Sequence, residues 1–293
     1  MTPWIALAAA LAGAAAQTAP PPAAPSDPII VEGERPQTEQ ALTDLARDIA
    51  GNPRPRRPLA RFESPLCLMV AASDTALGQE IAERIIENAR AARVPVRGKG
   101  CRANALLALS DDAQAQLRDV RASGRRLFAG LSPREIDAAL GARDPVYVFQ
   151  SSRQASNTGE PIVNSPEAFG SGGIIGPQNK IWSAGRLKRD IREDMLAALV
   201  VVDKAAVAGL TPIQIADYAS LRLLAPTGEV DVAEAGAPRT IMTLFVSPQN
   251  APQTLTRFDR AYLKALYRMP AGSFASEVLR AAVLDSARDD DED

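Results

Sequence analysis

Apolar residues recur along the first half of the chain with two periods, one typical of strands and one typical of helices. Residues 65–72 and 104–109 are short apolar runs, which favour strands buried on both faces. Between them, residues 75–93 carry an apolar stripe at helical spacing, made of Leu77, Ile81, Ile85 and Ala89. The order strand, helix, strand predicts a βαβ unit whose two strands lie side by side.

The same patterns predict the remaining elements. We expect strands at residues 144–150 and 196–203, and helices at residues 38–50, 112–122, 132–140, 212–224, 256–268 and 273–284. The fold class is therefore α/β (α+β), with a mixed sheet of about four strands, a long N-terminal crossover helix and C-terminal helices. The start of one helix is marked clearly, because Thr211 is a capping residue, Pro212 follows in the first turn and Gln214 lies three residues past the cap.

Two stretches between these elements have no periodicity. Residues 151–178 hold five glycines, and a stretch of this length is typical of a functional loop over a groove or of a disordered segment. Residues 186–195 mix basic and acidic side chains, which is typical of a solvated face.

The N-terminal region predicts export. Residues 1–16 are predicted to be a signal peptide, because an almost uncharged Ala/Leu run, too short to span a bilayer, ends in Ala14-Ala15-Ala16. Residues 17–37 form a Pro/Ala-rich linker, and within it residues 28–33 (PIIVEG) resemble the short box by which outer-membrane receptors engage an energy-transducing partner. We therefore expect a periplasmic or secreted protein without a transmembrane segment.

The rest of the chain divides into an N-terminal helix with a Pro/Arg-rich connector at 38–60, a single α/β domain at 61–285 and an acidic tail at 286–293. The formal net charge is −2, and the last five residues are all acidic, so the body of the chain is close to neutral. Aromatic residues make up only 4% of the chain. Nucleic acid is therefore not an expected partner, since it requires a basic stripe with interleaved aromatic residues.

The chain contains no histidine. The commonest metal ligand and the commonest general acid or base at neutral pH are therefore both missing. This composition excludes His-zinc hydrolases, Ser-His-Asp triads and Cys-His dyads. We expect no metal and no other cofactor.

The two cysteines, Cys67 and Cys101, are predicted to form a disulfide. An even number of cysteines suits an exported protein, and each cysteine lies in or just before one strand of the βαβ unit. Neighbouring strands bring Cα atoms to the separation of about 5.5 Å that a disulfide requires. The bond is expected to be structural, because no Cys-x-x-Cys spacing occurs.

Several short motifs follow the helix at 212–224 in a characteristic order. They are TIMTLF at 240–245, which contains Met242, then LTRFD at 255–259, then Leu266-Tyr267. This order resembles the zincin metallopeptidases, and the metzincins in particular, where the HExxH helix is followed by a Met-containing turn and by a closing helix that begins Leu-Ser/Thr-x-x-Asp and ends Leu-Tyr. The chain is also similar to uncharacterised bacterial secreted domains that keep this ending without the zinc motif.

The resemblance implies an old substrate cleft that has lost its metal. In HExxH two imidazoles one turn apart share a zinc ion and the Glu activates a water. Here the possible pairs at that spacing are Gln214/Tyr218, Ala216/Ser220 and Tyr218/Arg222, and none offers a zinc site. The candidate cleft has no catalytic residue and comprises Gln214, Asp217, Tyr218, Met242 and Tyr267.

Each of these residues also has a plainer interpretation. Gln214 fits a capping box, Asp217 fits an exposed helix carboxylate, and Met242 fits a core methionine. Tyr218, like Tyr267, fits a core residue whose hydroxyl reaches water.

Three functions are compatible with the sequence. The leading hypothesis is a non-catalytic zincin-like domain that binds a peptide, a glycan or an envelope protein. The second is a histidine-free glycan hydrolase that uses a pair of carboxylates from Asp203, Asp217, Glu229 and Asp231. The third is an accessory of an outer-membrane complex that acts through the N-terminal linker.

Overall fold

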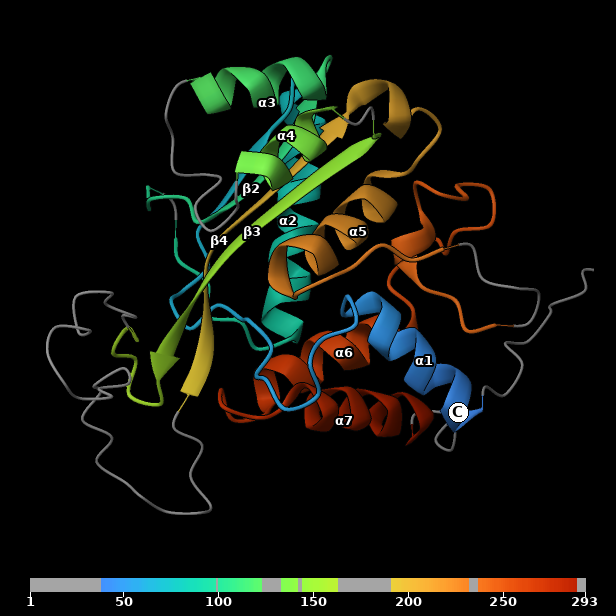
Figure 1. The fold of residues 1–293 in the computed structure, drawn as a ribbon. Helices are drawn as coiled ribbons and strands as arrows, with labels where there is room; N and C mark the ends of the chain where they lie inside the picture. Colours follow the sequence, from blue (N-terminus) through green and yellow to red (C-terminus); the bar gives the residue numbers. More distant parts are fainter. Residues whose placement is uncertain are drawn as a thin grey trace, which may run out of the picture. The chain divides into compact units, whose positions relative to one another are not determined.

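The computed structural model describes residues 38–98, 100–122, 133–141, 144–162, 191–231 and 237–288 of the 293-residue chain. The predicted signal peptide, the linker with its PIIVEG segment, and residues 163–178 of the glycine-rich stretch lie outside these ranges. The described elements are α1 (Glu39–Ile49), β1 (Leu68–Ala71), α2 (Thr75–Ala91), β2 (Ala105–Ser110), α3 (Ala113–Ala122), α4 (Pro133–Gly141), β3 (Val146–Ser156), β4 (Ile191–Asp203), α5 (Pro212–Leu224), α6 (Arg257–Arg268) and α7 (Ala275–Arg288) (Figure 1). None of the described helices combines the length and the hydropathy needed to cross a membrane.

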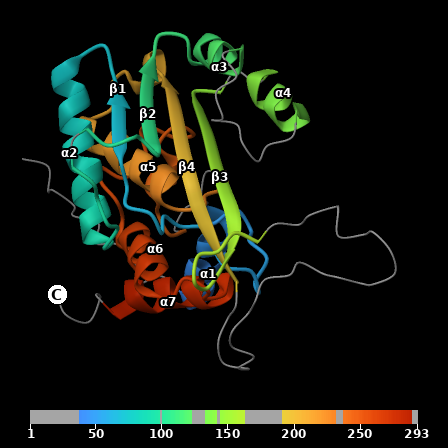
Figure 2. The same cartoon turned by 90° about the vertical axis from the view of Figure 1, so that its left-hand side faces the viewer.

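The four strands form one mixed sheet in the order β1-β2-β4-β3 (Figure 2). Strands β1, β2 and β4 are parallel, and β3 is antiparallel to β4 at one edge. The predicted α/β class and the sheet of about four strands are confirmed. The predicted pairing within the βαβ unit is also confirmed, because β1 and β2 are parallel neighbours and α2 connects them along the chain.

Strand β4 is buried on both faces of the sheet, as its apolar run predicts. Ala198, Val200 and Val202 face the larger core cluster, which contains α2, α5, α6 and α7. Leu199 and Val201 face the smaller cluster, which contains residues of α3 and α4. Helices α2 and α5 therefore cover one face of the sheet, and α3 and α4 cover the other (Figures 1 and 2).

Strands β3 and β4 are longer than predicted. Their pairing continues past the parallel strands through a bulge at Ser151/Ser152 and ends where Ser156 pairs with Ile191. The prediction of a loop from residue 151 was therefore wrong for residues 151–156, and the prediction of a solvated face at 186–195 was wrong for Asp194 and Met195, which are buried. Ion pairing explains the difference, because the Arg192 Nε atom donates to Asp194 Oδ1 at 2.7 Å and Asp194 is only 5% exposed.

Helix α1 belongs to the same hydrophobic cluster as α5 and α7, through Leu42, Leu45 and Ile49. Its C-terminal end is fixed by a close backbone approach, where the Gly228 N–H donates to the Ile49 carbonyl at 2.9 Å. A Cβ atom at Gly228 would lie 2.5 Å from the Gly51 Cα atom, so this crossing requires glycine. At the other end of the chain α7 extends to Arg288, which is four residues beyond the predicted helix end at residue 284 and three residues into the predicted tail.

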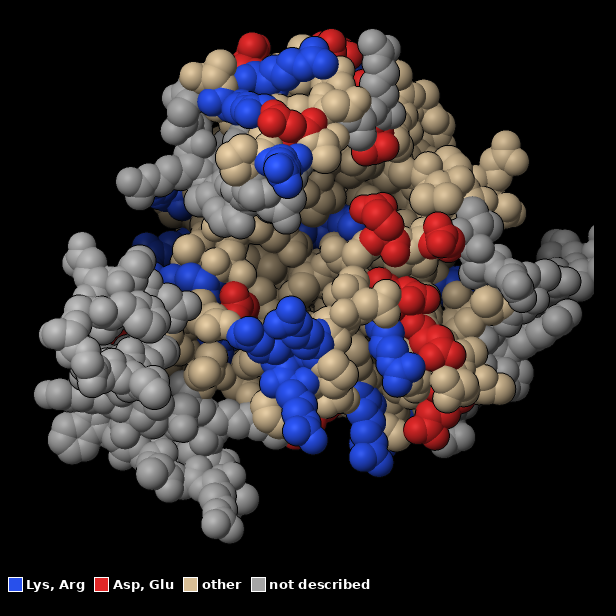
Figure 3. All heavy atoms as spheres, viewed as in Figure 1, with Lys and Arg blue, Asp and Glu red and all other residues tan. Residues whose placement is uncertain are grey.

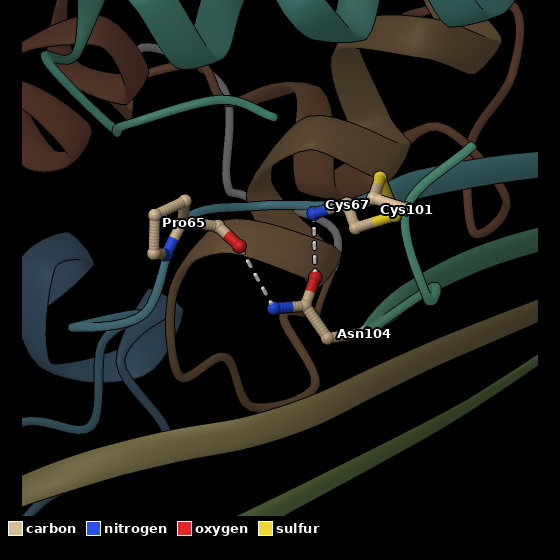
Figure 4. The surroundings of a disulfide bond; sticks show 4 residues. All are labelled: Pro65, Cys67, Cys101 and Asn104. Atoms are coloured by element: carbon tan, nitrogen blue, oxygen red, sulfur yellow. Dashed lines mark hydrogen bonds between the residues drawn. A yellow bond between two sulfur atoms is a disulfide. The ribbon is translucent and has the colours of Figure 1, made fainter. Parts of the chain in front are cut away.

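The predicted disulfide is confirmed, with Cα atoms of Cys67 and Cys101 6.0 Å apart (Figure 4). The side chain of Asn104 supports it, since its Oδ1 accepts from the Cys67 N–H at 2.7 Å and its Nδ2 donates to the Pro65 carbonyl at 3.2 Å. The crosslink and this amide together hold the start of β1 against the segment that leads into β2.

We predict that replacing both cysteines with serine lowers the free energy of unfolding by about 3–4 kcal/mol, because the crosslink restricts a loop of 34 residues in the unfolded chain. Equilibrium urea unfolding of the oxidised protein and of the double variant measures the difference. Wild-type protein in excess reductant serves as the control and should unfold like the variant. Equal stability of the oxidised and serine forms would contradict the prediction.

Candidate functional site

Helix α5 organises the region where the sequence places the candidate cleft. The predicted capping box is confirmed, because the Gln214 N–H donates to Thr211 Oγ1 at 3.1 Å and the Thr211 N–H donates to Gln214 Oε1 at 3.1 Å. Every residue from Gln214 to Leu224 is buried. The polar side chains of a buried helix must find hydrogen-bond partners within the protein, so each polar residue of α5 is expected to make a specific contact.

The carboxylate of Asp217 is completely buried and accepts hydrogen bonds from four residues. Arg84 Nε donates to Oδ1 at 2.7 Å and Asn88 Nδ2 donates to the same oxygen at 2.7 Å. The Thr254 hydroxyl donates to Oδ2 at 2.6 Å and the Leu255 N–H donates to it at 2.8 Å. The interpretation of Asp217 as an exposed helix carboxylate was therefore wrong.

These contacts keep Asp217 ionised. Burial by itself raises the pKa of the carboxyl group, but the hydrogen bonds from Arg84, Thr254, Asn88 and Leu255 outweigh burial and hold the pKa below its ordinary value. The same hydrogen bond to Asp217 raises the pKa of Arg84. The arrangement is an ion pair that joins α2, α5 and the segment before α6.

The surroundings of Asp217 test the comparison of α5 with an HExxH helix in one register. If Asp217 stood at the Glu position of HExxH, Ala216 and Ser220 would occupy the two His positions. Both are fully buried, and the Ser220 hydroxyl donates to the Ala216 carbonyl at 2.8 Å and accepts from Asn88 at 2.9 Å. The two positions that would carry the zinc ligands in this register are therefore enclosed in the core, where a zinc-bound water would have no access to solvent.

A different pair of α5 residues, Tyr218 and Arg222, bonds to each other one turn apart. Arg222 Nε donates to the Tyr218 hydroxyl at 2.9 Å, and the guanidinium carbon lies 5.3 Å from the centre of the Tyr218 ring. The C-terminal end of α5 contacts β3, since Gln150 Nε2 donates to the backbone carbonyl of Arg222 at 2.7 Å. Burial raises the pKa of Tyr218, which stays a neutral phenol.

The guanidinium of Arg222 is a buried cation with an exposed counter-ion. Its side chain is 4% exposed, whereas the Glu229 side chain that it contacts at 3.2 Å is 86% exposed. The remaining donors reach the Gly228 carbonyl at 2.9 Å and the Thr227 hydroxyl at 3.3 Å. Arg222 therefore provides a fixed positive charge that joins α5 to the segment 227–229 and is neutralised from the solvent side.

Met242 and Tyr267 are structural parts of the core around α5. Met242 lies in a short 3-10 turn at Ile241–Thr243 and is 2% exposed. The Tyr267 hydroxyl donates to the Leu224 carbonyl at 2.6 Å and accepts from the Phe62 N–H at 3.3 Å. Burial raises the pKa of Tyr267. The expectation of a hydroxyl that reaches water was wrong for Tyr267, because its partners are backbone groups.

The motif residue Asp259 connects the Met242 turn to α6. Its carboxylate accepts from the Thr240 hydroxyl at 2.6 Å, from the Ile241 N–H at 2.9 Å and from the Thr256 N–H at 2.9 Å. Burial raises the pKa of Asp259 despite these hydrogen bonds. The Thr-x-x-Asp cap of α6 therefore also holds the Met242 turn in place.

The structure does not bring the four candidate hydrolase carboxylates into one set of contacts. Asp217 is committed to Arg84, and Glu229 contacts Arg222 on another side of α5. Asp203 accepts from the Ala205 N–H at 2.9 Å and caps a 3-10 turn, and Asp231 is exposed. Within the described ranges no group of three or more Cys, Asp or Glu side chains is arranged to hold a metal ion.

Three residues that matter here were not singled out by sequence reasoning as site residues. Arg84 and Asn88 lie one turn apart on α2. Only the burial of Asp217 would have indicated them, because a buried carboxylate requires a cation and a hydrogen-bond donor. Arg222 was considered only as a zinc ligand and set aside, although a guanidinium in a buried helix is itself an indication of a specific polar site.

Comparisons of the chain with protein-family models, curated proteins and solved structures find no match. The resemblance to zincins, and a ligand-binding role for Gln214, Asp217, Tyr218, Met242 and Tyr267, therefore stay predictions that rest on the residues themselves.

We predict that Asp217→Asn lowers the free energy of unfolding at pH 7 by about 2–4 kcal/mol. This is somewhat less than the roughly 3–5 kcal/mol typical of a broken buried ion pair, because the Arg84 side chain is one-third exposed. Since the folded pKa of Asp217 is lowered, its stabilisation is present above the unfolded pKa of about 3.9 and is lost as the pH falls through the folded pKa. The difference between wild type and variant should therefore shrink below about pH 4.

Urea unfolding between pH 3 and pH 7 measures this effect. The matched control is Asp231→Asn, which removes an exposed carboxylate and should change stability by less than about 0.5 kcal/mol. A difference between wild type and Asp217→Asn that is constant across this pH range would show that the ionised carboxylate is not what stabilises the fold.

Proposed function

We propose that this chain is an exported, non-catalytic domain on a degenerate zincin-like scaffold, and that it binds an extended peptide segment of an envelope protein along the free edge of β3. The single observation that carries the proposal is this edge. Strand β3 is 11 residues long; residues 160–162 bond to its outer side at Gln154 and Ser156, and along residues 146–151 no described segment pairs with it. Such an edge offers a row of backbone donors and acceptors to another chain.

The hydrogen-bond pattern identifies which backbone groups point outward. The Asp203 N–H donates to the Pro145 carbonyl at 2.9 Å, so the pair at 145 and 203 is hydrogen-bonded across the two strands. Residues alternate in an antiparallel ladder, so the N–H and C=O groups of Val146, Val148 and Gln150 face away from β4. An added strand would bind to these groups.

The surroundings of the edge favour a peptide ligand. Figure 3 shows a hollow in this face of the molecule, over the ribbon of β3 and α5 seen in Figure 1. The end of α5 contacts β3 there, because Gln150 Nε2 donates to the backbone carbonyls of Arg222 and Ala225 at 2.7 Å. This contact supports the strand from the core side and leaves its outer edge to a ligand.

The non-catalytic part of the proposal rests on chemistry. The chain lacks histidine, and the one carboxylate that could replace the Glu of the zinc motif is held by Arg84 and Asn88. The zincin-like part is supported by the order of α5, the Met242 turn and the Asp259 cap, and by the contacts that join them. Export is supported by the disulfide, which suits an oxidising compartment.

We predict that the full chain, purified without chelators, holds only substoichiometric zinc and does not cleave casein. The reason is that the helix positions available for zinc ligands carry Ala216, Ser220, Tyr218 and Arg222, none of which binds zinc well. Elemental analysis and a fluorescent casein assay measure both quantities, with a HExxH metallopeptidase as the control. Stoichiometric zinc together with proteolysis that a chelator abolishes would overturn the proposal.

We predict that peptides selected on the wild-type chain from a random 12-residue phage library lose affinity when an outward N–H is removed from β3. Val148→Pro should weaken their binding by about tenfold, since one backbone hydrogen bond contributes about 1–1.5 kcal/mol. Val148→Ala is the matched control, because it shortens the same side chain and keeps the N–H. Fluorescence anisotropy with labelled peptides measures each affinity.

Circular dichroism and urea unfolding check that Val148→Pro folds, and Val146→Pro provides a second edge variant if the first does not. Two outcomes contradict strand addition. One is a selection that yields no peptide with saturable binding, and the other is equal binding to the Pro and Ala variants.

A further inference from the structure

A basic groove lies on the opposite side of α5 from the β3 edge. It has a volume of about 630 Å³ and is formed by the C-terminal half of α2, by α6 and by the end of α7. Figure 2 shows the ends of α2 and α7 on the same side of the molecule as α6. Its apolar lining consists of three alanines, Ala91, Ala92 and Ala261, which leave room along the floor, and of Leu255 and Leu263.

The charges of the groove are strongly unequal. Four cationic residues line it, Arg257, Arg260, Lys264 and Arg288, against one carboxylate, Asp285. That carboxylate already pairs with Arg268 at 2.9 Å, so it does little to offset the other cations. Lys264 and Arg288 are exposed and form no ion pair with any residue that the structure describes. The groove therefore attracts anions.

The spacing of the cations favours a particular kind of anion. Arg257, Arg260 and Lys264 lie three and four residues apart on α6, so they form one stripe with neighbours about 5–6 Å apart. In an extended peptide, alternate side chains point the same way and lie about 6.6–6.8 Å apart. Carboxylates at alternate positions of an extended peptide can therefore each meet a successive cation of the stripe.

We propose that this basic groove binds an acidic peptide segment of a partner protein, in extended conformation, with carboxylates at alternate positions. The small residues of the floor admit the peptide backbone, and Arg260, Lys264 and Arg288 contact its carboxylates. The groove is distinct from the β3 edge, so the proposal does not depend on strand addition. The chain itself ends in five consecutive acidic residues directly after Arg288, and the experiment has to separate these residues from a partner.

The test measures binding of a fluorescein-labelled peptide of alternating Asp and Ser, six residues long, to two full-length proteins. One is the wild-type chain, and the other carries Asn or Gln at all five positions from 289 to 293. We expect the neutral-tail protein to bind the peptide at low salt and to bind an Asn-Ser analogue at least tenfold more weakly. Binding should also weaken as salt is raised, because the charges are exposed.

A double charge reversal locates the site. Arg260→Glu with Lys264→Glu in the neutral-tail protein should weaken binding by about tenfold or more, because two attractions of an exposed kind become repulsions. Arg56→Glu with Arg280→Glu is the matched control, since it changes the net charge equally at exposed positions outside the groove, and it should stay within about twofold.

Each outcome bears on the proposal. Binding by the neutral-tail protein alone supports the groove and identifies the acidic terminus as a competitor for it. The proposal is overturned by an absence of peptide binding to both proteins, and by equal weakening in the two double variants, which would indicate a general charge effect. It is also overturned if vesicles with anionic headgroups bind through Arg260 and Lys264 while the peptide does not.

Discussion

The buried carboxylate of Asp217 is the interaction on which the arrangement of the helices depends. A charge without exposure must be paired, and its partners come from three separate parts of the chain: Arg84 and Asn88 on α2, and Thr254 with Leu255 before α6. None of these segments can shift without leaving an unsatisfied charge in the interior. Asp217 thus fixes one side of α5 against α2, while Tyr218 and Arg222 of the same helix pair with each other.

Around this ion pair the residues that resemble a protease motif act as structural connections. Gln214 donates to the Pro252 carbonyl at 3.1 Å, Asp259 holds the turn of Met242, and Tyr267 joins α6 to the end of α5. Each contact ends on backbone atoms of a turn, a loop or a helix end, which lack regular hydrogen-bonding partners of their own. These residues are therefore explained by the segments around α5 that they hold, whatever the domain does.

The sequence predicted those parts of the fold that depend on local chemistry. The Thr211 cap, the apolar run of β4 and the pairing of Cys67 with Cys101 were all evident, because each follows from neighbouring residues or from a spacing along the chain. Distant pairing was not evident. The strand at residues 191–195 was hidden because its pairing partner is the distant segment 152–156 of β3, and Asp217 looked exposed because Arg84 is 133 residues away in sequence. The direction of Arg222 likewise depends on packing that no local pattern reveals.

The covalent ring closed by Cys67 and Cys101 contains the whole of α2. Helices ordinarily begin to unravel at their ends, but here both ends of the segment are tied to adjacent strands. Arg84, which neutralises Asp217, and Asn88, which donates to it, both lie within this disulfide-closed ring. We infer that α2 does not unfold from its ends turn by turn, and that it stays in place until the whole ring separates from α5 in one cooperative step.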